Sequence, residues 1–135
     1  LSVDSDDYFV QVVDLLKKKR ALQKERVEEI IGEVKDGLEM EEELIFEGNS
    51  DWPLFLAARA ASNLVSEYKV PVFLYEKGER ESQGSARSRS DYDLLKLMKP
   101  CARPLVNWGG HKQAAGFGLK NKDIPRFKKC LIKNL

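Results

Sequence analysis

The segment Val70–Tyr75 (VPVFLY) limits the possible folds most strongly, because almost all of its side chains are apolar. A strand that is apolar on both faces is typical of a sheet covered by helices on both sides. Pro71 is expected at the start of this strand, where its missing N–H is least costly. The segment therefore predicts a β-sheet packed between layers of helix.

Helices and strands alternate along the rest of the chain. Short apolar or alternating segments predict strands at 44–46, 70–75, 82–90 and 114–119. Capping residues and apolar spacing predict helices at about 53–67, at 91–98, around 105–106 and from 123 onward. This order predicts an α/β fold, a single domain with a central mixed β-sheet of about four to five strands flanked by helices.

A long helix is expected at the start of the chain, from residue 8 to about 38. The apolar residues of its second half recur at helical spacing: Val27, Ile30, Ile31, Val34 and Leu38. A similar stripe precedes them, so the segment is either one helix or two helices with a bend near Arg20. We divide the chain into a helical connector at 1–40, leading from a preceding domain, and an α/β domain at 41–135.

The net charge of +1 hides an uneven distribution. Residues 1–51 contain 7 Lys/Arg and 15 Asp/Glu, whereas residues 52–135 contain 16 and 7. A basic C-terminal part can attract a polyanion such as nucleic acid. The alternative is that acidic helices simply cluster early in the chain, and charge alone does not separate the two. The run Lys17–Arg20 is interpreted as a solvated helix face rather than a phosphate patch.

Hydropathy and cysteine content bear on the cellular setting. No apolar run approaches the roughly 18 residues that cross a bilayer, and no basic-then-apolar leader is present. The two cysteines, Cys101 and Cys130, form no Cys-x-x-Cys pair, so reduced thiols are expected. These features predict a cytoplasmic protein with no membrane partner.

The polar segment Gln83–Ser90 (QGSARSRS) has the residue types of a phosphate site. Gly84 lets the backbone approach a ligand closely, and Ser85 and Ser88 supply hydroxyl groups. Arg87 supplies a planar cation that matches phosphate oxygens two at a time, and in a strand it shares a face with Ser85. The alternative is a surface strand with ordinary solubilising arginines.

The segment Trp108–Leu119 (WGGHKQAAGFGL) contains the only histidine of the chain, His111. The preceding glycines, Gly109 and Gly110, can turn backbone N–H groups toward an anion. The imidazole can donate a hydrogen bond to a phosphate oxygen or protonate a leaving group. Small residues after it leave room for a ligand: Ala114, Ala115 and Gly116. The alternative is a helix C-cap at the glycines with an exposed histidine.

Together these two segments resemble the paired signatures of the DHH-associated domain, the C-terminal module of DHH-superfamily phosphoesterases. The signatures are Gly84–Ser88 (GSARS) and Gly109–Phe117 (GGHKQAAGF), and they are most similar to those of RecJ-like single-strand exonucleases. The similarity runs from about residue 20 to the end. Two features depart from the family pattern: Leu54–Ala57 replaces a glycine-containing stretch, and the Asp-His-His motif is absent.

The resemblance implies a substrate-binding module that closes over a nucleic-acid strand, opposite a metal-dependent DHH catalytic domain of the same longer chain. Mn²⁺ or Mg²⁺ is expected in that domain and no cofactor or metal in residues 1–135, where Asp4, Asp6 and Asp7 are interpreted as a helix start. Arg87 is expected to neutralise a phosphate, and His111 is the expected catalytic residue. The remaining expected phosphate-site residues are Ser85, Ser88, Gly109, Gly110, Ala114, Ala115 and Gly116.

Three functions are compatible with this resemblance. The first is the substrate-binding domain of a single-stranded DNA or RNA exonuclease, inactive without its metal domain. The second is the same domain in a phosphodiesterase that acts on oligoribonucleotides or cyclic dinucleotides. The third is a non-catalytic nucleic-acid-binding adaptor. Trp108 and Phe117 either stack on bases in such a site or belong to the core.

Overall fold

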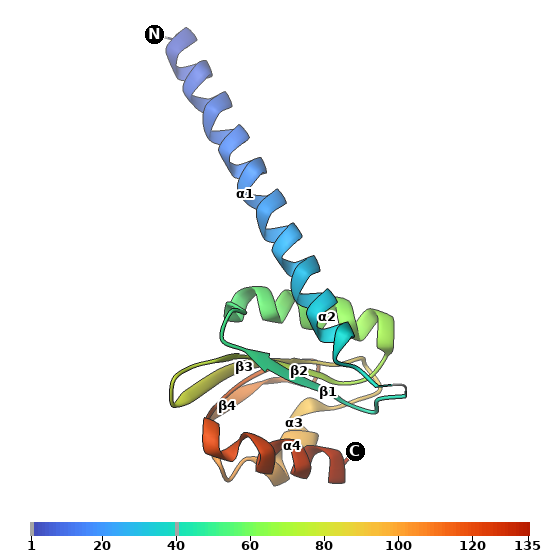
Figure 1. Cartoon of the computed structure of the whole chain (residues 1–135). Helices are drawn as coiled ribbons and strands as arrows, with labels where there is room; N and C mark the ends of the chain where they lie inside the picture. Colours follow the sequence, from blue (N-terminus) through green and yellow to red (C-terminus); the bar gives the residue numbers. More distant parts are fainter. Residues whose placement is uncertain (1, 40) are drawn as a thin grey trace.

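A computed structural model of the chain describes residues 2–39 and 41–135 (Figure 1). The elements follow in the order α1 (Ser2–Asp36), β1 (Ile45–Asn49), α2 (Leu54–Tyr68), β2 (Val72–Lys77), β3 (Glu81–Arg87), α3 (Leu94–Met98), the 3-10 turn η1 (Lys99–Cys101), β4 (Leu105–His111), β5 (Ala114–Lys120), η2 (Asn121–Asp123) and α4 (Ile124–Lys133). The strands form one sheet in the order β1-β2-β3-β5-β4. Only β1 and β2 are parallel, so the sheet is mixed and the predicted α/β fold is confirmed.

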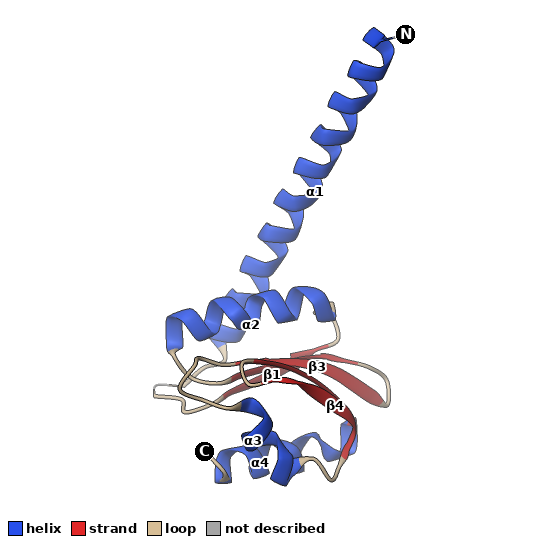
Figure 2. Cartoon of the chain, turned by 180° about the vertical axis from the view of Figure 1, so that it is seen from behind, coloured by secondary structure: helices blue, strands red, loops and turns tan. Residues whose placement is uncertain are grey.

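Helices lie on both sides of the sheet (Figure 2). On the first face, α1 and α2 pack against Ile45, Val72 and Leu74. On the second face, α3 and α4 pack against a core that includes Phe46, Phe73 and four strand positions further along the sheet: Ala86, Ala115, Phe117 and Leu119. Because consecutive residues of β2 alternate between these two cores, the segment at 72–74 is apolar throughout, as its sequence predicted.

Helix α2 lies close to the sheet because its inner face is made of small side chains. Ala57, Ala60 and Ala61 have no exposed surface. The helix packs against β2 and β3, while the core beneath it receives no side chain from β4 or β5 among the described residues. The first face of β5 and β4 is therefore left without an apolar cover.

Helix α1 is continuous, without a bend near Arg20, and only its second half belongs to the globular part. Val27, Ile30 and Val34 are buried against α2. The first half projects away from the sheet (Figure 1), and its large apolar side chains are exposed: Tyr8, Phe9, Val10, Leu15, Leu16 and Leu22. Even so, no helix in the described part of the chain is long and apolar enough to cross a membrane.

A hydrogen-bonded cluster fixes α1 to the start of α2. The indole Nε1 of Trp52 donates to Glu33 Oε2 at 2.6 Å, and the Arg26 guanidinium donates to the Asp51 carbonyl at 2.6 Å. Arg26 also lies 3.4 Å from Glu33, so one cation and one indole share the same carboxylate. These contacts connect α1 to the segment that precedes α2.

Replacing Trp52 by phenylalanine is expected to lower the free energy of unfolding by about 1.5 kcal/mol. A hydrogen bond to a charged group contributes roughly 1.5–3 kcal/mol, and the low end applies because the Glu33 side chain is 45% exposed. Urea denaturation measures the change. The same substitution made together with Glu33→Gln serves as the control, because the two effects must then be less than additive. Full additivity would contradict this coupling.

Two local predictions were wrong, each for a reason outside the local sequence. Leu105 and Val106 belong to β4 and not to a helix, because the segment pairs with β5. The cap of α3 is Asp93, whose carboxylate accepts from the backbone N–H groups of Leu95 and Lys96. Asp91 instead lies 3.4 Å from Arg89.

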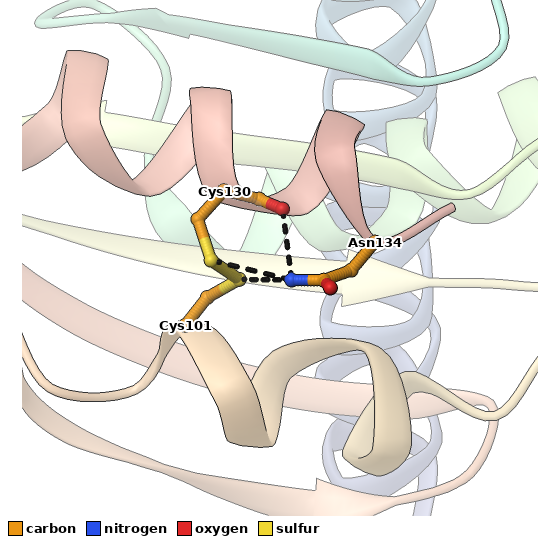
Figure 3. Close-up of a disulfide and its surroundings, with 3 residues drawn as sticks. All are labelled: Cys101, Cys130 and Asn134. Carbon is orange, nitrogen blue, oxygen red and sulfur yellow. Dashed lines mark hydrogen bonds between the residues drawn. A yellow bond between two sulfur atoms is a disulfide. The ribbon is translucent and has the colours of Figure 1, made fainter.

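The expectation of reduced thiols was also wrong, because Cys101 and Cys130 form a disulfide (Figure 3). Their separation of 29 residues gives no motif in the sequence, but η1 and α4 pack against the same face of the sheet and bring the sulfurs together. The side-chain amide of Asn134, which follows α4, lies 3.2 Å from the Cys101 sulfur and donates to the Cys130 carbonyl at 3.0 Å. The disulfide therefore joins the two helical segments beneath the second face.

Candidate functional site

The two sequence motifs meet on the first face of the sheet. Arg87 of β3 pairs with Ala114 of β5, and Ala114 pairs with His111 of β4. Residues directly opposite each other in antiparallel strands direct their side chains to the same face. Strand β3, which carries Arg87, and strand β4, which carries His111, are thus separated by two strand spacings, about 10 Å. The only side chain between Arg87 and His111 in this row is the methyl group of Ala114.

Small residues continue this surface along β5. The next row, two residues along each strand, is Ser85, Gly116 and Gly109, and the row after it is Gln83, Gly118 and Asn107. Gly109 and Gly116 are exposed. A Cβ on Gly109 would meet no atom within 4 Å, and one on Gly116 would meet only the Gly84 carbonyl at 3.7 Å. We call these three rows the shelf.

Arg87 lies at one end of the shelf with its charge uncompensated. The side chain is half-buried, and its one hydrogen bond in the described part of the chain goes from Nη1 to the Ala86 carbonyl at 2.9 Å. No carboxylate there forms an ion pair with it, whereas neighbouring Arg89 is paired with Asp91. Burial lowers the pKa of Arg87 from its ordinary value, but an arginine remains protonated at neutral pH. The site therefore presents a partly desolvated cation to solvent.

His111 is exposed at the opposite side of the same row. Its Nδ1 accepts a hydrogen bond from the backbone N–H of Gln113 at 3.4 Å. In a neutral imidazole one ring nitrogen accepts and the other carries the proton. The hydrogen bond therefore places the proton on Nε2, where it is available as a donor to a ligand.

Ser88 holds the β4–β5 turn in place. Its backbone N–H donates to the Gln113 carbonyl at 3.1 Å, and its hydroxyl donates to the Lys112 carbonyl at 3.2 Å. The Leu94 N–H donates to the same Lys112 carbonyl at 2.8 Å. Ser88 thereby joins the end of β3 to the turn that follows His111, while Ser85 lies nearly buried in the middle row of the shelf.

Two glycines of the motifs are required by the packing of the sheet. Gly84 faces the second core, where a Cβ would collide with the Phe117 ring, so its expected role beside a ligand was wrong. Gly110 has φ of +135°, and a Cβ there would collide with the Ala114 carbonyl oxygen. Gly109, Gly110 and His111 belong to strand β4, which excludes the helix C-cap that the sequence allowed.

The aromatic residues of the second motif lie off the shelf. Phe117 is buried in the second core, and Ala115, expected in the phosphate site, has its side chain in the same core. Trp108 pairs with Phe117 and so also belongs to the second face, where 37% of it is exposed. Gln83 and Asn107 also lie on the shelf but were not predicted as site residues. The period-two spacing of Gln83 from Ser85 and Arg87 was a signal for the first of them.

Within the described residues, no three histidine, cysteine, aspartate or glutamate side chains gather in a way that could hold a metal ion. The Mn²⁺ or Mg²⁺ centre that the family resemblance implies thus finds no ligand set in this part of the chain.

Known proteins match this chain in sequence and in structure. Residues 43–135 match the DHHA1 domain family. RecJ of Bacillus subtilis, a single-stranded-DNA-specific exonuclease, is 25% identical over 132 residues, which are 96% of this chain but 17% of that protein. The Mg²⁺ complex of RecJ from Thermus thermophilus superposes with a TM-score of 0.70 at 24% identity over 82% of this chain and 17% of that one.

A pGpG-specific phosphodiesterase from Vibrio cholerae has the same fold, with a TM-score of 0.56 and 16% identity over 86% of this chain and 41% of that one. The chain thus corresponds in length to about a sixth of the RecJ proteins it matches. The family match spans residues 43–135 and so includes both motif strands of the shelf: this chain belongs to the DHHA1 domain family.

Proposed function

We propose that the shelf binds the phosphodiester backbone of single-stranded nucleic acid, as the substrate-binding part of a RecJ-like exonuclease. The observation that carries the proposal is the Arg87–Ala114–His111 row: an unpaired cation and an N–H donor share one open face across a residue too small to block them. A phosphate above Ala114 can accept from both groups. Charge-assisted hydrogen bonds of this kind are among the strongest in proteins.

The rest of the shelf fits the same ligand. Its middle row presents two glycines, so a strand can lie against the backbone of β5. The part of the chain that builds the shelf, residues 52–135, has 16 Lys/Arg against 7 Asp/Glu. Backbone contacts carry no sequence information directly, so affinity for the phosphate row is expected to be tolerant of base sequence and to fall with added salt.

The first test measures binding of a fluorescently labelled single-stranded oligonucleotide by anisotropy at low salt. Arg87→Ala is expected to weaken binding about 10- to 100-fold, because a lost hydrogen bond to a charged group corresponds to roughly 1.5–3 kcal/mol. His111→Ala is expected to weaken it less, since one N–H donor is lost and not a permanently charged guanidinium. Arg89→Ala is the matched control, because that guanidinium is already paired with Asp91. Equal losses for Arg87→Ala and Arg89→Ala would show that only overall charge matters.

A second candidate ligand is a dinucleotide or short oligoribonucleotide. The specific observation in its favour is that the exposed backbone of the shelf is short, because Gly118, in the third row, is already buried by its neighbours. Titration with strands of two to twelve nucleotides separates the two. Affinity that stops rising at two or three nucleotides favours the short ligand, and affinity that keeps rising favours a continuous strand.

A further inference from the structure

Two side-chain amides meet above a glycine at the far end of the shelf. A Cβ built on Gly118 of β5 would lie 2.6 Å from Asn107 Oδ1, 2.8 Å from Gln83 Nε2 and 2.9 Å from Gln83 Oε1. Gln83 reaches this point from β3 and Asn107 reaches it from β4, on opposite sides of β5. The absence of a side chain at Gly118 is what lets both amides occupy this position.

The amide pair lies on the same face as the phosphate row. Gly118 is four residues from Ala114 along β5, a distance of about 14 Å at the rise of an antiparallel strand. Gln83 and Asn107 are exposed. Neither amide makes a hydrogen bond in the described part of the chain, unlike Ser82 and Ser88 nearby, whose hydroxyls donate to Asn121 and Lys112.

The chemistry of this pair differs from that of the phosphate row. A carboxamide carries no charge to neutralise a phosphate, but it presents an acceptor oxygen and two donor hydrogens in one plane. Nucleobase edges present donors and acceptors side by side in the same manner, and Asn and Gln are the side chains that pair with them bidentately. Two such groups from opposite strands can therefore contact the edge of one base.

We propose that Gln83 and Asn107 form a base-contacting subsite, which receives the base of a nucleotide adjacent to the phosphate held by Arg87 and His111. The subsite rests on the proposed function, since it uses the strand that the phosphate row positions. It adds base preference to a surface that otherwise binds the backbone alone. Gly118 belongs to the subsite because any side chain there displaces both amides.

The test compares an ordinary single-stranded oligonucleotide with one of equal length built from abasic residues, which has the same phosphates and no bases. The double variant Gln83→Ala/Asn107→Ala is expected to bind the ordinary strand about tenfold more weakly, a change typical of one or two lost neutral hydrogen bonds, and to bind the abasic strand as the unchanged protein does. Arg87→Ala is expected to weaken binding of both strands. Gln11→Ala, an exposed amide on the projecting half of α1, is the control.

The outcomes separate the two proposals. If the double variant binds both strands as well as the unchanged protein, the subsite is wrong while the phosphate site stands on the Arg87→Ala result. If the unchanged protein binds neither strand, the proposed function itself fails. A loss of abasic-strand binding in the double variant would also overturn the subsite, because the amides would then act on the backbone. Circular dichroism and thermal midpoints confirm that the variants are folded.

Discussion

Gly110→Ala is expected to lower the free energy of unfolding by roughly 2–6 kcal/mol, as the sum of backbone strain and overpacking. The φ of +135° is one that residues with a Cβ rarely adopt. A Cβ at this position would also lie 2.7 Å from the Ala115 Cα and collide with the Ala114 carbonyl oxygen. Both are backbone atoms of the paired strand, so neither can move aside as a flexible side chain would.

The neighbouring glycine gives the control for this experiment. Gly109→Ala places a methyl group where no atom lies within 4 Å, so its effect on stability is expected to stay within about 1 kcal/mol. Urea denaturation of the two variants therefore tests whether Gly110 is needed for the backbone conformation while Gly109 is not. Gly109→Ala is expected to reduce oligonucleotide binding without unfolding the domain. Equal stability of the two variants would contradict the assigned backbone geometry.

Reduction of the Cys101–Cys130 disulfide is expected to lower the free energy of unfolding by roughly 3–4 kcal/mol. The bond closes a loop of 29 residues, and a cross-link of that span removes a corresponding amount of chain entropy from the unfolded state. For a domain with the usual 5–15 kcal/mol of stability, this is a large share. Thermal or urea denaturation with and without a phosphine reductant measures it.

The double variant Cys101→Ala/Cys130→Ala controls for effects of the reductant itself. Its midpoint is expected to match that of the reduced protein and not to change when reductant is added. Two titratable thiols in protein purified without reductant would contradict the disulfide. Because η1 and α4 cover the second face, whereas the shelf lies on the first, affinity for an oligonucleotide at 25 °C is expected to persist after reduction.

Much of the fold was predictable from local patterns. The apolar run at 72–74 and the alanines of α2 encode a sheet with helices on both sides, because period and side-chain size act within a few residues. Strand β4 was not predictable in this way. Its residues Leu105–His111 include two glycines and lack a regular alternation of apolar and polar side chains, so only pairing with β5 makes them a strand. The disulfide depends on the same kind of long-range packing.

The candidate site was also predictable only in part: its residue types could be read from the sequence, but their arrangement could not. The residue types around Arg87 and His111 indicated phosphate chemistry, but their placement in one row depends on the register of three strands, which the sequence does not encode locally. The same limit explains Gly84, which resembles a ligand-approach glycine in sequence and packs beneath Phe117 in the structure. Asn107 was not predicted as a site residue because the two residues before it, Leu105 and Val106, were predicted as a helix.

Helix α1 is held at its second half only, so its first half extends from the domain without support. At 1.5 Å per residue, the segment at 5–25 extends roughly 30 Å beyond the Arg26–Glu33–Trp52 cluster. That cluster lies where the projecting part of the helix begins. A tilt of about 10° there moves the far end by roughly 5 Å over that length. Since α2 contacts both α1 and β3, a continuous set of packed contacts connects the helix to the strand that carries Arg87.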